Sequence, residues 1–332
     1  MILSDPLPPN AIAVRVGCRL VYATSQPAAA LLLIRPHPDV AILEESLSCD
    51  TGSPAEHFID HHGNRMLRTI LRPGLNEFVH DAILIVPGEA DDPPPCTPMD
   101  ASESLPWEVL RYTFPSRYCE SDKLGQFAQQ TFGGIPPGVR LAQAICDWTH
   151  RHIEYRYGSG NPHLSAADVI GRGYGVCRDF AHVMVALCRA LDMPARYVAG
   201  HMPYRGVAEH DIGIDFHAWC EVFAGGRWHT FDPRHNKSLP GRVKLAHGMD
   251  AVDAAFATFY GHASAATFQV WSYQVDPALA RAGDPIAIIK GGNGSAEEVA
   301  GACFDAFRVR PPLPHSLHPP SLQASSPARL HG

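Results

Sequence analysis

The sequence lacks the features that mark membrane, secreted and nucleic-acid-binding proteins. No apolar run in it approaches the roughly 20 residues that a membrane-spanning helix needs. Residues 1–6 show no basic segment followed by an apolar core, so we expect no secretory signal. Positive charge is also scarce, because 27 basic residues stand against 34 acidic ones and the net charge is −7. We therefore expect no nucleic-acid partner and no membrane association.

Paired cysteines and metal-binding motifs are missing as well. The chain has nine scattered cysteines, an odd number, and none forms a Cys-x-x-Cys pair. This pattern favours free thiols in a reducing cytoplasm over a disulfide framework. There is no His-Glu-x-x-His motif either. The remaining metal candidates are His61, His62, His150, His152 and His210. None has a typical ligand spacing, and we predict no metal and no cofactor.

The composition is that of a globular protein, and 332 residues are enough for two domains. Residues 1–90 read as a β-rich domain that resembles a small antiparallel sandwich. Within it the expected strands cover residues 12–22, 30–34, 66–71 and 81–86. Residues 91–100 form a proline-rich linker that cannot join a strand ladder. A second domain covers 101–275, and residues 276–332 read as a mostly disordered tail.

The second domain has mixed periodicity, which predicts an α+β fold. Apolar residues at helical spacing predict one helix before Tyr155 and another over residues 176–191. A strand is expected at 195–199, followed by two strands around Gly225-Gly226 and one short helix over 252–259.

Cys177 stands at the start of the predicted helix 176–191. Only a thiolate is nucleophilic, and a helix N-terminus favours negative charge and offers unpaired N–H donors to an oxyanion. Gly173 and Gly175 permit a tight turn and close passage of substrate. The alternative is that Cys177 is one more buried structural cysteine, which is the reading we favour for Cys188 and Cys220.

The hairpin around Gly225-Gly226 predicts how a histidine and an aspartate meet. With a two-residue turn, paired residues have numbers that sum to 451, as 225 and 226 do. His217 and Trp219 then share a face, and Asp232, opposite Trp219, is a diagonal neighbour of His217. A three-residue loop would move Asp232 to the other face. Alternatively, His217 is a core histidine and Asp232 begins a turn.

These segments resemble the bacterial transglutaminase-like family, which is related to the papain-like thiol enzymes. The matching motifs are GVCRDFAH at 175–182, FHAWCEV at 216–222 and GRWHTFDPRHN at 226–236. The resemblance covers residues 101–275. Residues 11–86 look like the β-rich N-terminal domain often found in these proteins, with DHHGN at 60–64 as a marker. The resemblance implies a papain-like α+β core, in which a helix bearing the cysteine packs on an antiparallel sheet.

Carried over by resemblance, Cys177 is the nucleophile, His217 the base and then the acid, and Asp232 the residue that orients His217. The implied chemistry is acyl transfer at a peptide or amide bond through a thioester. We prefer hydrolysis, as in a cysteine peptidase or amidase. Transamidation of protein glutamine by a primary amine and a noncatalytic peptide-binding scaffold are the alternatives. The sequence has no recognisable calcium loop of the animal cross-linking enzymes, which favours a metal-independent reaction.

Three aromatic residues are further candidates at this site. Tyr155 and Tyr157 could each donate a hydrogen bond to the oxyanion, although packing is the more common role of such rings. Trp219 is expected to pack beside His217 and exclude water. Two residues of the cysteine helix have structural interpretations: Asp179 complements the helix dipole or anchors a neighbouring loop, and His182 lies on another face of the helix.

Overall fold

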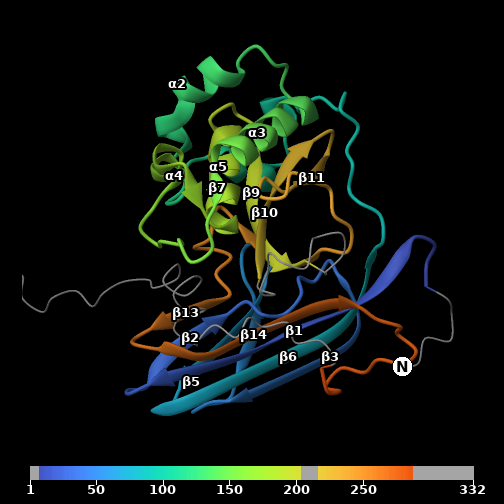
Figure 1. Ribbon diagram of the computed structural model, residues 1–332, viewed down its shortest axis with the longest axis vertical. Helices are drawn as coiled ribbons and strands as arrows, with labels where there is room; N and C mark the ends of the chain where they lie inside the picture. Colours follow the sequence, from blue (N-terminus) through green and yellow to red (C-terminus); the bar gives the residue numbers. More distant parts are fainter. Residues whose placement is uncertain (1–6, 203–215, 287–332) are drawn as a thin grey trace, which may run out of the picture.

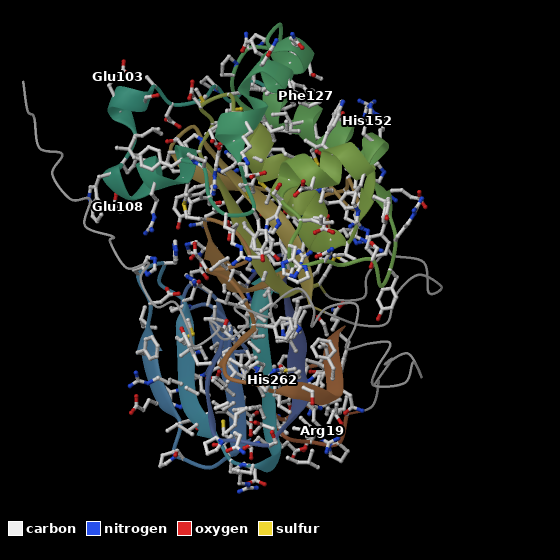
Figure 2. All side chains as sticks on the ribbon, turned by 90° about the vertical axis from the view of Figure 1, so that its left-hand side faces the viewer. Arg19, Glu103, Glu108, Phe127, His152 and His262 are labelled. Carbon is white, nitrogen blue, oxygen red and sulfur yellow. The ribbon has the colours of Figure 1, made fainter. Side chains whose placement is uncertain are left out.

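The protein is described by a computed structural model, which places residues 7–202 and 216–286. Strands gather in its lower half and helices in its upper half (Figure 1). Figure 2 gives the same division from the side, with Arg19 and His262 on the strand-rich part and Glu103 and Glu108 on the helical part. No helix in the described ranges is both long and apolar enough to cross a membrane.

The strand-rich part is a sandwich of two four-stranded sheets, with strand orders β14-β1-β6-β3 and β13-β2-β5-β4. Its strands are β1 (Ala11–Thr24), β2 (Ala28–Leu32), β3 (Ala41–Asp50), β4 (Glu56–Ile59), β5 (Arg65–Leu71), β6 (Gly74–Pro87), β13 (Ala257–Tyr260) and β14 (Ser264–Gln274). Fully buried side chains from both sheets, among them Leu20, Leu32, Leu71 and Phe78, form one core between them. Alternating exposure along β5 reflects the period-two pattern that predicts it.

The sequence analysis missed β3 and β4 and mistook β13 for a helix. Both missed strands are outer strands with many exposed positions, and β3 gives the core between the sheets only the part-buried Leu47 and Cys49. The short helix expected over 252–259 is wrong. Residues 251–254 form turns, and β13 pairs with β2 through Phe259 and Ala30.

The C-terminal strands also correct the expected domain boundaries. β14 lies antiparallel to β1, with Cys18 opposite Val270, although β14 falls within the 101–275 range expected for the second domain. The helical part is therefore inserted between β6 and β13 of one sandwich. The expected tail begins with an ordered piece, because Gly283 donates its N–H to Asp81 at 2.6 Å. The rest of that tail, from residue 287, lies outside the described residues.

The helical part surrounds an antiparallel sheet of order β11-β10-β9-β12. The strands of that sheet are β9 (Ala195–His201), β10 (His217–Ala224), β11 (Arg227–Phe231) and β12 (Val243–Gly248). A separate parallel pair is formed by β7 (Glu154–Tyr155) and β8 (Tyr174–Gly175). The helices and 3-10 turns of the helical part are η1 (Ser102–Ser104), α1 (Trp107–Leu110), η2 (Arg111–Thr113), α2 (Ser121–Phe132), α3 (Val139–His152), α4 (Ala166–Arg172) and α5 (Cys177–Arg189). The expected helices before Tyr155 and over 176–191 correspond to α3 and α5.

Helix α5 is the centre of this part. Every residue from Arg178 to Arg189 is buried, because α2, α3 and α4 cover the sides that the sheet leaves open (Figure 1). Its polar residues are buried with partners. The Arg189 guanidinium, for example, donates to the carbonyls of Ala195, Phe114 and Met249. The helix stops before Asp192, which has a left-handed backbone with φ of 60°.

Two sets of contacts, among others, hold the helical part to its surroundings. The residues 60–64 marker forms the turn after β4, where Asn64 is fully buried and its side chain bonds His247 of β12 in both directions, at 2.8 and 2.9 Å. The expected linker 91–100 is fastened to the β10–β11 hairpin: Asp91 accepts from the N–H of Thr230, and Asp100 from that of Gly226.

Candidate active site

The β10–β11 hairpin has the register that the sequence predicts. Cys220 faces Phe231 and Ala224 faces Arg227, so the paired numbers sum to 451. Gly225 and Gly226 take φ values of 59° and 78°, as a two-residue turn with left-handed positions requires. Asp232 follows directly after β11 and is therefore held beside the first residue of β10.

His217 and Asp232 form a buried pair. The Nε2 of His217 lies 2.9 Å from Oδ2 of Asp232. The same oxygen accepts from Arg242 at 2.8 Å, and Oδ1 accepts from the N–H groups of Arg234 and His235 at 3.2 Å each. The carboxylate is thus fixed by four donors, which leaves it little freedom to rotate. Arg242 is a member of this group that the sequence analysis missed, because it comes from a separate segment ten residues downstream.

Cys177 is the first residue of α5 and is half-buried. The turn before it is tight, because Asp179 reaches back and accepts the N–H of Val176 at 3.0 Å. A side chain on Gly175 would come within 2.7 Å of Asp179, so the close turn requires glycine there. Arg178 binds the other oxygen of Asp179 at 2.8 Å. Asp179 therefore anchors the segment that presents the thiol, one of the two roles expected for it.

The electrostatics of the group keep His217 charged. Burial opposes the charge, but the Asp232 charge and hydrogen bond, with smaller contributions from the Cys177 thiol, raise the pKa of His217 to about 9. Burial likewise opposes ionisation of Asp232, yet the His217 charge and hydrogen bond and then the Arg242 charge hold its pKa well below the usual range. Because Asp232 occupies Nε2, the other ring nitrogen, Nδ1, is left for the thiol. At neutral pH this arrangement favours an imidazolium beside Cys177.

The aromatic candidates take different positions. Trp219 is almost fully buried and stacks on His217 with ring centroids 6.3 Å apart, so it shields the imidazole from water. Tyr155 is half-buried against Phe180, and its ring carries the Arg234 guanidinium at 3.8 Å. Tyr157 is 54% exposed. A contribution of either tyrosine to an oxyanion site stays a prediction.

The residues expected to be structural are buried in the core. Cys188 and Cys220 are fully buried, and burial raises the pKa of both thiols, that of Cys188 to about 12. The Nε2 of His182 accepts the N–H of Ala251 at 3.1 Å, and its ring stacks on Tyr118. None of these three groups is poised to react.

Potential metal ligands come together at one place in the described residues: atoms of His217, Asp232 and His235 lie within 4.8 Å of one another. The donor set does not fit a divalent cation well. Asp232 already binds the Arg242 guanidinium, and His235 contacts the Arg234 guanidinium at 2.5 Å. A metal would have to displace two cations. His210 lies outside the described residues.

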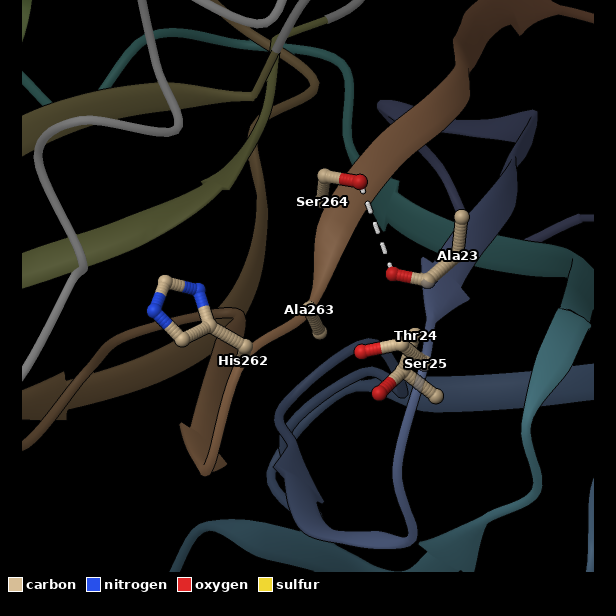
Figure 3. A pocket seen from close by; sticks show the side chains of 6 residues that line it. All are labelled: Ala23, Thr24, Ser25, His262, Ala263 and Ser264. Atoms are coloured by element: carbon tan, nitrogen blue, oxygen red, sulfur yellow. Dashed lines mark hydrogen bonds between the residues drawn. The ribbon is translucent and has the colours of Figure 1, made fainter.

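A separate hollow lies at one end of the sandwich (Figure 3). It is lined by Ala23, Thr24, Ser25, His262, Ala263 and Ser264. Among these lining residues His262 is the only titratable side chain, and Ser264 donates to the Ala23 carbonyl at 3.4 Å. The hollow offers no nucleophile–base pair, unlike the group around Cys177.

Comparisons with known proteins point to a family. The model of the transglutaminase-like superfamily matches residues 125–233, which include Cys177, His217 and Asp232. Uncharacterized proteins of Mycobacterium leprae and Mycobacterium tuberculosis are 30% and 27% identical over 115 and 186 residues, and the chain spans 41% and 59% of their lengths.

A crystal structure from Cytophaga hutchinsonii, described as a "putative cysteine protease", is 32% identical with a TM-score of 0.69. The match covers 80% of this chain and 92% of that one. Similarity of sequence and fold over nearly the whole of a solved relative places this chain in the transglutaminase-like superfamily, a group of papain-like thiol enzymes.

Proposed function

We propose that the protein is a cysteine-dependent enzyme that hydrolyses a peptide or amide bond through a thioester on Cys177. The observation that carries the proposal is the buried His217, which binds Asp232 on one side, faces Cys177 on the other, and has a pKa of about 9. A protonated imidazole beside a thiol is the arrangement that activates cysteine nucleophiles.

The reaction follows from the positions of these groups. The Cys177 sulfur attacks the substrate carbonyl carbon, and the N–H of Cys177 at the start of α5 helps to hold the oxyanion. As the C–N bond breaks, His217 gives its Nδ1 proton to the leaving amine. Neutral His217 then takes a proton from water, whose oxygen attacks the thioester carbonyl. The bond between the acyl carbon and the sulfur then breaks, which releases the carboxylic acid and regenerates the free sulfur of Cys177. Asp232 keeps the imidazole oriented throughout.

Water is the preferred acceptor. The description of the Cytophaga hutchinsonii relative as a protease supports this choice. If a primary amine attacked the same thioester in place of water, the product would be a new amide and the reaction would be transamidation. The acyl-enzyme steps are shared, so the two outcomes differ only in what attacks the thioester.

A library of peptide amides, with and without an added primary amine, tests the proposal. Product masses distinguish a free acid from a new amide. We expect free acids from the native protein and from a Cys96→Ala control, because Cys96 is an exposed cysteine remote from this site in sequence. We expect no product from Cys177→Ala. Turnover by Cys177→Ala would show that the nucleophile is misassigned, and amide products would favour transamidation.

A noncatalytic peptide-binding scaffold is tested by alkylation. Iodoacetamide at mildly acidic pH should label Cys177 faster than the exposed Cys96, because a charged His217 beside the thiol is the arrangement that activates cysteine nucleophiles. Equal labelling of the two cysteines would favour the scaffold and contradict an activated nucleophile.

A further inference from the structure

Arg234 lies at the edge of the proposed catalytic group and contacts both of its sides. On the histidine side, its Nη1 is 2.5 Å from Nε2 of His235, whose ring centroid is 5.1 Å from that of His217. On the cysteine side, its guanidinium carbon is 3.8 Å from the centre of the Tyr155 ring. Tyr155 pairs with Gly175, two residues before Cys177. The guanidinium thus contacts His235, which neighbours His217, and Tyr155, whose strand pairs with the segment before Cys177.

Within residues 7–202 and 216–286, no carboxylate neutralises the charge of Arg234. Asp232, two residues earlier, is bonded by the Arg234 backbone N–H and not by its side chain. His235 is neutral or positive in either protonation state, so this neighbour cannot compensate the charge; burial lowers its pKa to about 3. By contrast, Arg156, the residue after Tyr155, is paired with Glu154 at 2.6 Å.

An unpaired guanidinium at this place is suited to a carboxylate. Its planar fork of donors matches carboxylate geometry, and stacking on Tyr155 fixes the plane before any ligand arrives. The chain has a net charge of −7, so this guanidinium is not one of many in a generally basic surface.

We propose that Arg234 binds a carboxylate of the substrate, so that the preferred substrates are acidic peptides or amides. The inference rests on the proposed function, because it concerns the substrate of the same site.

Two alkylating reagents of nearly equal size test the inference without knowledge of the natural substrate. Iodoacetate and iodoacetamide both form a C–S bond at the thiolate and release iodide, but only iodoacetate carries a carboxylate. The measured quantity is the ratio of their rate constants at Cys177, obtained by peptide mass spectrometry. In Arg234→Gln we expect the iodoacetate-to-iodoacetamide ratio to fall by about five- to tenfold, which lies within the usual net contribution of one hydrogen bond. Arg234→Lys should fall less, because it keeps the charge but loses the stacked fork.

Arg156→Gln is the matched control, because it removes an arginine adjacent to Tyr155 whose charge is already paired. Its ratio should stay close to that of the native protein. An unchanged ratio in Arg234→Gln, or an equal fall in both variants, would overturn the assignment. Failure of the proposed function has a different signature, since Cys177 would then react no faster than Cys96 with either reagent.

Matched peptide amides then identify the source of the carboxylate. One pair differs by glutamate against glutamine, and the other by a C-terminal acid against a C-terminal amide. We expect the native protein to prefer the acid in one pair, and Arg234→Gln to raise KM for that acid by about five- to tenfold with a smaller change in kcat. Turnover with no preference for the acid in either pair would refute carboxylate recognition.

Discussion

One buried oxygen of the Asp232 carboxylate binds two of the groups that form this site. This oxygen, Oδ2, serves both His217 and Arg242, and the Arg242 and Asp232 side chains are 10% and 0% exposed. Two cations on one oxygen account for an aspartate that stays ionised in the interior. Arg242 therefore helps to stabilise the folded site, and its removal leaves a buried charge with one partner fewer.

Arg242→Met should lower the free energy of unfolding by roughly 2–3 kcal/mol, because Asp232 would lose a buried ion pair. Urea unfolding at pH 7 measures the change. Arg68→Met is the control, since the Arg68–Glu56 pair is exposed and should be worth less than about 1 kcal/mol. Equal losses in the two variants would argue against a special role for Arg242.

His217 predicts a pH dependence of stability. Its pKa rises from about 6.5 in the unfolded chain to about 9 in the folded protein. The folded form keeps a proton that the unfolded form releases, so this stabilisation is complete below pH 6.5 and is lost as pH rises towards 9. The free energy of unfolding, measured at intervals across that window, should fall with pH in the native protein. In Asp232→Asn the His217 contribution to this slope should disappear. A slope that survives unchanged in the variant would mean that another group causes it.

At the scale of elements, the start of α5 determines where the thiol points. The turn is set by Asp179 and by the closeness of Gly175, where a Cβ would lie 2.7 Å from the Asp179 side chain. The helix itself is secured independently, because it is buried on all sides. A change at Gly175 should consequently disturb the presentation of Cys177 more than the fold.

Gly175→Ala should slow the iodoacetamide labelling of Cys177 by roughly tenfold or more and lower stability by about 1–3 kcal/mol, through overpacking at the turn. Gly171→Ala in α4 is the matched control, because nothing lies within 4 Å of its added Cβ and alanine favours a helix interior. Labelling rates and urea unfolding report the two effects. Undisturbed labelling in Gly175→Ala would show that the turn has room to adjust.

At the scale of the whole molecule, the chain leaves the sandwich and returns to it. Trp271 of β14 is buried under β1, where a side chain on Gly17 would collide with its ring, and its Nε1 donates to Asp81 at 2.9 Å. Asp81 also binds Arg15 at 2.6 Å. The last strand of the sandwich thus completes the packing of the first, and the inserted helical part depends on both.

Trp271→Ala should cost about 3–5 kcal/mol, as expected when a large core side chain is removed. Trp107→Ala, at a tryptophan that is 79% exposed, should change stability by less than about 0.5 kcal/mol. Thermal or urea unfolding compares them. Since the helical part is inserted in the sandwich, we expect the preferential labelling of Cys177 to be lost over the same urea range in which the sandwich unfolds. Separate transitions would contradict that coupling.

The sequence predicted some parts of this architecture better than others. The hairpin register followed from two glycines and the alternation of strands, and α5 followed from helical spacing. Strands β3 and β4 were missed because both are edge strands: the alternation in β3 covers only residues 46–50, and all four residues of β4 are exposed. β13 was taken for a helix because Val252, Phe256 and Phe259 happen to fit helical spacing, while their segment actually turns and then pairs with β2.

The sequence by itself identified the residues of the proposed reaction group and the helix start and hairpin that position them. Cys177, His217 and Asp232 are recognisable because a helix start and a two-residue hairpin obey short-range rules of backbone geometry. Only the tertiary structure decided that Arg242 shares the Asp232 oxygen and that β14 closes the sandwich. It also decided that no carboxylate in the described part of the chain pairs with Arg234. Such contacts join segments far apart in the chain, and their energies depend on burial and on the neighbours that long-range packing supplies.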